Sequence, residues 1–168
     1  MIFDKKTWFS KRILEIEDGM YRFAFCILKN DEDVQDAIQE SILKAYKNLK
    51  TLKDKSKFKS WMFTILKNTC FENLKKRSEY LEITDEIVSN SNDIDLKLTL
   101  WDAVQNLSQP YRTTVTLFYY EDMSIKDISK ITNTKEDAIK KQLSRGREKI
   151  KEVIEDENFS RYKNKKNC

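Results

Sequence analysis

The sequence contains no histidine, the residue most often used as a general base and as a metal ligand near neutral pH. Its three cysteines, Cys26, Cys70 and Cys168, lack the close spacing of a zinc site or of a redox-active pair. With only two glycines, the chain also has no glycine-rich loop that could hold a phosphate group. We therefore expect a protein that is not an enzyme and that holds no metal and no cofactor.

Turn-forming residues are equally scarce, because the 168 residues include 2 glycines and 1 proline. So few breakers favour helices over a sheet protein, which needs many tight turns. Hydrophobic residues make up 39% of the chain and charged residues 36%, which suffices for packed helices but is little for one large core. The composition therefore predicts the all-α class, with two small helical domains.

Long hydrophobic runs are missing too. No stretch approaches the roughly 20 apolar residues that a membrane span requires. The first residues lack the apolar region of a signal peptide, and an odd number of cysteines fits a reducing compartment. We therefore expect a cytoplasmic protein without direct membrane insertion.

The net charge of +4 is small, but the charges are unevenly distributed. Residues 44–77 contain eleven Lys or Arg and two acidic residues, whereas residues 79–95 contain six acidic residues and no basic ones. Residues 123–151 are again basic, with nine Lys or Arg against four acidic residues. Two basic segments predict two surfaces for a polyanion, although lysines that only keep a helix face in solution are the alternative for each.

Apolar residues in the first half of the chain repeat at intervals of three and four, which predicts helices over residues 9–28, 34–49 and 58–74. The acidic segment that follows has a run of Ser and Asn at its centre and predicts a flexible linker over residues 79–96. In the second half, Val115, Phe118 and Tyr119 are expected on the apolar face of a helix.

The most informative stretch lies near the C-terminal end of the chain. Ser124 with Asp127, and Thr134 with Asp137, have the spacing of capping pairs that start helices. Two helix starts ten residues apart predict a short helix, a tight turn and a second helix, which is the order of a helix-turn-helix. Asn133 lies at the turn and can adopt the left-handed conformation that such a turn requires.

The second of these helices has two contrasting faces. Small or apolar residues are expected inward, at Ile139, Leu143, Gly146 and Ile150. The opposite face is polar and mostly basic, with Lys140, Lys141, Ser144, Arg145 and Glu148. A DNA recognition helix needs this arrangement, because its exposed face enters the major groove while the apolar face fixes its angle. A packed helix hairpin without a DNA-binding role is the alternative.

The resemblance to one family is specific. The second domain resembles region 4 of bacterial sigma factors, which binds the promoter −35 element, through LSQPYRTTVTLFYYEDMSIKDISKITNTKEDAIKKQLSRGREKI (residues 107–150). The first resembles region 2 of the extracytoplasmic-function (ECF) group, through DEDVQDAIQESILKAYKNL (31–49) and FKSWMFTILKNTCFENLKKR (58–77). The two matches occur in the family's order.

The resemblance implies a layout of four parts. A region 2 helical bundle is expected over residues 9–78, and the flexible acidic linker over 79–96. A region 4 domain with the helix-turn-helix follows over 97–153, and a basic tail over 154–168.

Several positions depart from the family pattern. Asp122 and Asn133 lie where the family usually has glycine, and Gly146 lies where alanine is usual. The segment Lys55-Ser56-Lys57 replaces a usual Gly-Glu in a loop that the family uses near the −10 element. The resemblance therefore implies an unusual promoter preference at that element.

By this resemblance, the protein is an alternative sigma factor that binds core RNA polymerase and directs promoter-specific transcription initiation at −10 and −35 elements. The residues implied for polymerase binding are Asp36, Gln39, Glu40 and Lys44. Those implied for the −10 element are Ser56, Lys57, Phe58, Lys59, Ser60, Thr64, Lys67 and Asn68. Those implied for the −35 element are Lys140, Lys141, Ser144 and Arg145, with Arg112 and Arg147 contacting phosphate.

The residues alone leave other interpretations open. The polar set on residues 36–44 also fits a solvated helix face, and Phe58 fits either the core or a base-stacking position, whereas Trp61 is expected in the core. A stand-alone helix-turn-helix regulator would explain residues 97–153 without polymerase. A module that only binds another protein is a further alternative. The family resemblance also implies an anti-sigma factor as a partner, often a membrane-anchored one.

Overall fold

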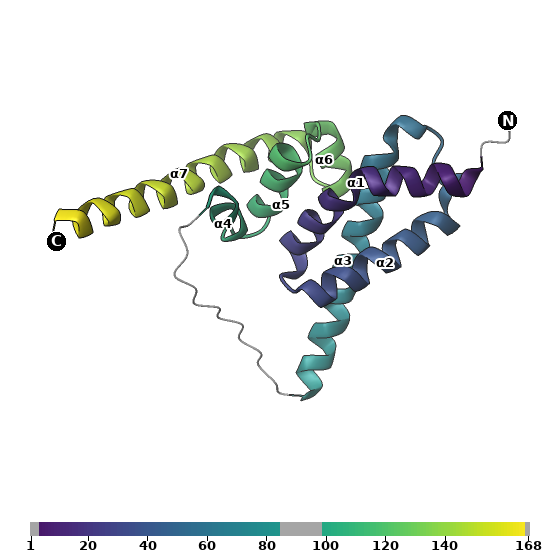
Figure 1. Ribbon diagram of the computed structural model, residues 1–168, viewed down its shortest axis with the longest axis horizontal. Coiled ribbons are helices and arrows are strands. Elements are labelled where there is room, and N and C mark those ends of the chain that lie inside the picture. The colour runs from purple at the N-terminus through teal and green to yellow at the C-terminus, as the bar shows by residue number, and fades with distance from the viewer. Residues whose placement is uncertain (1–3, 85–98, 167–168) are drawn as a thin grey trace.

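The computed structural model describes residues 4–84 and 99–166, with side chains over 4–80 and 99–156. Every regular element within these described ranges is a helix, and the helices form two small domains (Figure 1). The all-α prediction is therefore confirmed. Among the described helices, none combines the length and the apolar character that crossing a membrane would require.

Three helices, α1 (Lys5–Leu28), α2 (Asp31–Lys47) and α3 (Phe58–Thr84), pack against one another in the first domain. The turn between α1 and α2 is short because Asn30 caps α2, accepting a hydrogen bond from the backbone N–H of Asp33 at 3.0 Å. Two short 3-10 turns, η1 (Leu49–Thr51) and η2 (Lys55–Lys57), then connect α2 to α3.

Large side chains from these helices fill the core of the first domain. The most buried of them, each with less than 2% of its surface exposed, include Met20, Phe23, Phe58, Met62, Phe63 and Leu66. Burying one such side chain contributes about 1.5–3 kcal/mol. Cys26 and Cys70 are buried here as well, and burial raises the pKa of the Cys70 thiol to about 12.

Helix α3 is longer than expected, since it runs ten residues beyond the predicted end at residue 74. The basic run at 75–77 resembles the C-terminus of a helix, but no glycine or proline follows it to end the helix. Arg77 instead forms an ion pair with Asp33 of α2, at 2.6 Å. The expected linker is therefore helical over residues 79–84, and its remainder lies outside the described residues.

The second domain is built from α4 (Leu100–Gln105), α5 (Tyr111–Val115), η3 (Thr116–Tyr120), α6 (Ile125–Thr132) and α7 (Glu136–Lys166). The element η3 is a single π-helical turn, which shifts the side-chain register after Val115. Leu117 is therefore buried, whereas Tyr119, expected on the apolar face, is 48% exposed. Helix α7 continues into the expected basic tail as far as Lys166.

The predicted helix-turn-helix is present as α6, a turn and α7. Ser124 caps α6 and accepts a hydrogen bond from the backbone N–H of Asp127 at 3.1 Å. Asn133 ends α6 in the left-handed conformation, with φ at 51°. The second expected capping pair is not formed in this way, because the Thr134 hydroxyl donates to the carbonyl of Thr132.

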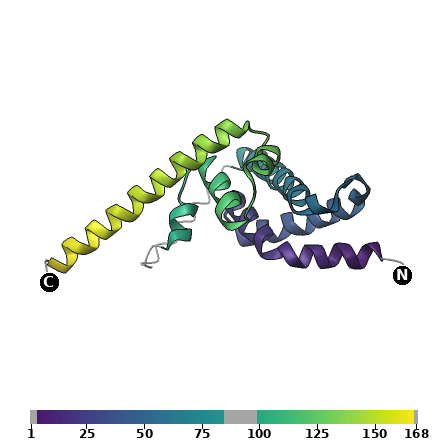
Figure 2. The same cartoon turned by 90° about the horizontal axis from the view of Figure 1, so that it is seen from above.

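The two domains also contact each other. Helix α1 packs on η3 and α5, and α3 packs on α6. The C-terminal part of α7 points away from these contacts and forms one arm of the molecule, while the start of α1 lies at the opposite end (Figures 1 and 2). The helix-turn-helix consequently lies next to the first domain, with the start of α7 near the junction.

Candidate nucleic-acid interface

The N-terminal half of α7 has the two faces that the sequence predicted. Ile139 and Leu143 are buried, with 0% and 3% of their surfaces exposed, and they lock the helix onto its own domain. The opposite face, here named the recognition face, consists of the exposed residues Lys140, Lys141, Ser144 and Arg145. An exposed basic face on a helix held by its apolar side can enter the roughly 12 Å wide major groove of DNA.

Gly146 explains how closely α7 lies on α5. A Cβ atom at this position would be only 2.7 Å from Cγ2 of Val115, a separation that side chains do not tolerate. The family's usual alanine would therefore push the two helices apart. At Asp122, φ is 51°, so the position where glycine is usual does require the left-handed conformation.

The two arginines expected at phosphates are placed differently. The guanidinium of Arg112 points into its own domain and donates to the carbonyl oxygens of Gln105 and Leu107, both at 3.3 Å. It thus satisfies carbonyls at the end of α4, and its contact with phosphate stays a prediction. Arg147 is exposed, and it donates to the hydroxyl of Tyr119 at 3.0 Å.

The two lysines at the start of α3 are held by the second domain. The Nζ atom of Lys59 donates to the carbonyl oxygen of Glu121 at 2.7 Å and lies 3.5 Å from its carboxylate. Lys57 lies 3.8 Å from the carboxylate of Asp127, in the first turn of α6. Both lysines therefore face carboxylates.

The three hydroxyl residues of the −10 set hydrogen bond within their own segment. Ser56 donates to Asp54, Ser60 donates to the carbonyl of Lys57, and Thr64 donates to the carbonyl of Ser60. These bonds fix the first turns of α3 and leave the hydroxyl oxygens free to accept from a ligand.

Phe58 belongs to the hydrophobic core. Only 1% of its surface is exposed, and its ring makes edge-on contacts with Trp8 and Phe9, with centroids 5.4 and 5.8 Å apart. It therefore cannot stack on a base without leaving the core, which corrects its place in the −10 set. Trp61 is half-buried and packs beside Phe58, in agreement with the core interpretation.

Lys67 and Asn68 lie further along α3 and line a cleft between the domains. The opposite wall comes from α5 and the helix-turn-helix, and it includes Pro110, Thr132 and Gln142. The cleft has a volume of about 600 Å³. We name the solvent-facing members of the −10 set the α3 face: Ser56, Lys57, Lys59, Ser60, Thr64, Lys67 and Asn68.

The residues expected to bind polymerase share one side of α2. Asp36 and Gln39 are exposed, with no helix of the described chain over them. Lys44 instead joins α2 to α3, with its Nζ 2.8 Å from Glu72 and 2.9 Å from Glu40. The hydrogen bonds with Glu72 and Glu40 raise the pKa of Lys44, and the one with Lys44 lowers that of Glu40.

Sequence reasoning missed three residues at the domain contact. The carboxylate of Glu121 is buried, with 2% of the side chain exposed, and it accepts a hydrogen bond from Nε of Arg22 at 2.8 Å. It lies directly over Gly19 of α1. The available signal was Gly19 itself, because a glycine inside a helical pattern often marks a close approach.

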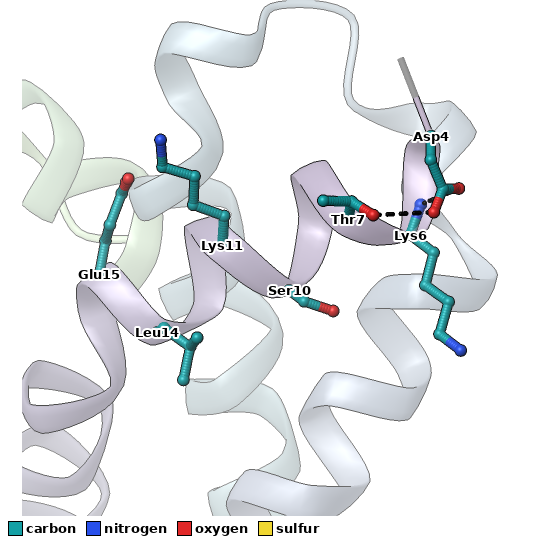
Figure 3. Close-up of a pocket in the computed structure, with 7 residues that line it drawn as sticks. All are labelled: Asp4, Lys6, Thr7, Ser10, Lys11, Leu14 and Glu15. Atoms are coloured by element: carbon teal, nitrogen blue, oxygen red, sulfur yellow. Dashed lines mark hydrogen bonds between the residues drawn. The ribbon is translucent and has the colours of Figure 1, made fainter. Parts of the chain in front are cut away.

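One further hollow lies along α1. Figure 3 shows a shallow hollow along α1, where Thr7 donates to Asp4 while Lys6, Ser10 and Leu14 extend outward from the helix. A single helix lines this hollow, so nothing encloses a ligand there. Across the described parts of the chain, no group of three or more Cys, Asp or Glu side chains is placed to hold a metal ion.

Comparison with known protein families gives two matches. The model of Sigma-70 region 2 matches residues 14–80, and that of Sigma-70 region 4 matches residues 97–150. The chain is 31% identical to the RNA polymerase sigma factor SigV of Bacillus subtilis over 137 residues, which span 79% of this chain and 82% of that protein. It is 27% identical to the ECF RNA polymerase sigma factor SigM of the same organism, over 80% of this chain and 87% of that one.

Two solved structures have a similar fold. One is the sigma factor RpoE in complex with the anti-sigma factor NepR from Bartonella quintana, with a TM-score of 0.75 and 22% identity over 88% of this chain and 96% of that chain. The other is CnrH in complex with the cytosolic domain of CnrY, with a TM-score of 0.67 and 16% identity over 90% of both chains.

Proposed function

This chain belongs to the ECF group of the sigma-70 family, and from that premise we propose how its residues divide the work of promoter recognition. It is an alternative sigma factor that binds core RNA polymerase and directs transcription initiation at specific promoters, and it is not an enzyme. The assignment of promoter elements and polymerase contacts to particular residues is the proposal.

The recognition face reads the −35 element. Its four residues project from a helix that is fixed by buried Ile139 and Leu143, and this is the observation that carries the proposal. Arg145 and the lysines can donate to the acceptor edge of guanine in the major groove, and Ser144 can donate to or accept from a base edge. Arg147, exposed two residues after Arg145, contacts a neighbouring phosphate.

The α3 face binds the −10 element on the non-template strand. Its lysines supply phosphate contacts along a single strand, and its hydroxyls and Asn68 supply hydrogen bonds to unpaired bases. Opening the duplex sacrifices stacking of about 1.4 kcal/mol per step, so contacts to the separated strand must compensate. Phe58 contributes by holding the start of α3 on the core.

The exposed side of α2 binds core polymerase. Asp36 and Gln39 present a carboxylate and an amide from a rigid helix, which suits a partner surface of mixed charge. Glu40 and Lys44 contribute less directly, because their mutual ion pair and the one with Glu72 orient that side of the helix.

The domain limits and the remaining partner are also proposals. The matches to 14–80 and 97–150 support a region 2 domain over 9–78 and a region 4 domain over 97–153. Similarity in fold to sigma factors solved with anti-sigma factors supports an anti-sigma factor as a partner of this chain. We also propose a cytoplasmic location, which a partnership with core polymerase supports.

The decisive experiment is transcription in vitro from a promoter library, with purified core polymerase and the full chain. We expect initiation at a defined set of promoters that share −10 and −35 sequences. Gln39→Ala should reduce initiation at all of them to a similar degree, whereas Arg145→Ala should change which −35 sequences are used. A chain that neither associates with core polymerase nor directs it to any start site contradicts the proposal, and DNA binding without core would indicate a stand-alone regulator.

A further inference from the structure

One carboxylate sits at the centre of the contact between the domains. The side chain of Glu121 follows η3 and is 2% exposed, so its charge has been taken out of water. Arg22 of α1 donates to Oε1 at 2.8 Å, and the Nζ of Lys59 of α3 lies 3.5 Å from Oε2. A buried carboxylate is stable only when paired, and here both partners come from the other domain.

The floor of this site, here named the Glu121 seat, is Gly19. A Cβ atom on Gly19 would lie 2.1 Å from Oε2 of Glu121, so any other residue would displace the carboxylate. Glycine inside a helix is unfavourable compared with alanine. Helix α1 thus gives up helical stability at the point where the carboxylate of Glu121 reaches it.

Further contacts continue on both sides of the seat. At one end, the Nζ of Lys29 donates to the carbonyl and the side-chain oxygen of Gln105, at 2.6 and 2.8 Å. At the other end, Lys57 faces the carboxylate of Asp127 at 3.8 Å. The domains therefore meet along a continuous polar line.

Two lysines of the α3 face lie on this line. Lys57 and Lys59 each face a carboxylate of the second domain, and these carboxylates would compete with a DNA phosphate for the two ammonium groups. We propose that the Glu121 seat is an autoinhibitory latch: in the free chain, the second domain occupies Lys57 and Lys59 with its own carboxylates, and the seat must open before they bind promoter DNA. The inference rests on the proposed −10 role of these two lysines. The contacts that form the Glu121 seat are independent of that role.

Two variants open the seat by different means. Gly19→Ala fills the floor without changing a charge, and Glu121→Gln keeps the shape but removes the charge that Arg22 and Lys59 neutralise. Ser10→Ala is the matched control, because it also introduces alanine on α1 but at an exposed position away from the seat. Circular dichroism establishes that each chain retains its helices.

The state of the latch can be measured in the full chain with nitroxide labels at Lys11→Cys and Glu152→Cys, both exposed, in a Cys168→Ser background. Electron–electron double resonance should give one narrow distance distribution for the parent and for Ser10→Ala, and broad distributions for Gly19→Ala and Glu121→Gln. A parent distribution that is already broad, or that neither variant changes, overturns the latch.

The inhibitory effect is measured separately, as the affinity of the free chain for a fluorescein-labelled promoter fork chosen from the library experiment. Both opening variants should bind the fork roughly threefold to tenfold more tightly than the parent, because the apparent affinity of a chain equals its intrinsic affinity multiplied by the fraction that is open. Opening without tighter binding overturns the inhibitory role. Failure of the parent to initiate transcription with core polymerase would instead contradict the proposed function, and it would leave the distance result unchanged.

Discussion

The two lysine-rich surfaces of this protein are in opposite states. On α7, the recognition face is exposed to solvent and accessible to a ligand. On α3, Lys57 and Lys59 already have carboxylate partners from the second domain. A basic stretch of sequence therefore predicts affinity for anions. It does not predict whether its lysines are exposed in the free protein or already paired with carboxylates of another domain.

The difference follows from how each surface is determined. The recognition face depends on helical periodicity, because buried and exposed residues alternate within a few positions of one another. The partners of the α3 face come from another domain, and Glu121 lies 62 positions after Lys59 in the sequence. No local pattern records such a pairing. The predictions below test this contrast, beginning with the largest effect.

The largest effect is expected within α3 itself. Phe58→Ala should lower the free energy of unfolding by about 3–5 kcal/mol, since it removes a buried ring and leaves a cavity. Ser60→Ala, two residues further along on the α3 face, should change it by less than about 0.5 kcal/mol. Urea unfolding of both variants measures the difference. Equal stability of the two variants would return Phe58 to the DNA-binding set.

On α7, the expected effect is on recognition rather than on folding. Arg145→Ala should weaken binding to the preferred −35 sequence by about 1–3 kcal/mol, and by less on sequences that lack the preferred base. Fluorescence anisotropy on a panel of −35 duplexes measures this. Lys151→Ala is the control on the same helix, because Lys151 pairs with Glu155 outside the recognition face. A uniform loss over all sequences would mark Arg145 as a phosphate contact.

Much of the fold could be predicted from the sequence because its determinants are local. The caps at Asn30 and Ser124 and the left-handed turn at Asn133 follow from side chains that bond their own backbone. The π-helical turn could not be predicted, since its register shift depends on packing, and Tyr119 was consequently placed on the wrong face. The end of α3 was misplaced because a basic run resembles a helix terminus.

In the candidate site, too, some features could be predicted from the sequence and others could not. The faces of α7 were predicted correctly, because Ile139 and Leu143 lie four residues apart on one side of the helix, whereas Lys140 and Lys141 fall between them on the other side. Arg112 looked like a phosphate ligand, but its guanidinium donates to carbonyls of its own domain. A charged side chain gives no sign in the sequence of whether it faces solvent or the end of a neighbouring helix.

The salt dependence of DNA affinity should also distinguish the exposed recognition face from the lysines of the α3 face that are paired with carboxylates. The expected effect is smaller. Each phosphate contact contributes about 0.9 to the slope of log affinity against log salt concentration. Lys140→Ala should reduce that slope by about one for duplex DNA bound by the free chain, because Lys140 is exposed. Lys57→Ala should leave the slope nearly unchanged, since its partner in the free chain is Asp127.

The matched test is the same titration in the Gly19→Ala background with the promoter fork as ligand. There Lys57 should be released, and Lys57→Ala should reduce the slope to the extent that Lys140→Ala does. Equal slopes for Lys57 and Lys140 in the parent chain would mean that the two surfaces do not differ in the free protein.

The smallest effect is a pH dependence at the domain contact. Burial, and secondarily the charge of Arg112, lowers the pKa of Lys29 from the ordinary 10.5 to about 8. The penalty for holding this ammonium in the fold is fully present below pH 8, because the folded and unfolded chains then both carry the proton. It fades as the pH rises from 8 toward 10.5, where only the unfolded chain keeps the proton, so stability should increase over this window.

Lys29 is partly exposed, and solvent screening should limit the gain to under about 1 kcal/mol. Urea midpoints at pH 7.5 and 9.5, compared between the parent and Lys29→Met, isolate this contribution, because the other titrating groups are present in both chains and largely cancel in the comparison. The parent should gain stability relative to Lys29→Met over this interval. A relative loss would mean that the hydrogen bonds from the charged Lys29 to Gln105 outweigh its burial, and that the contact between the domains is strongest when Lys29 is protonated.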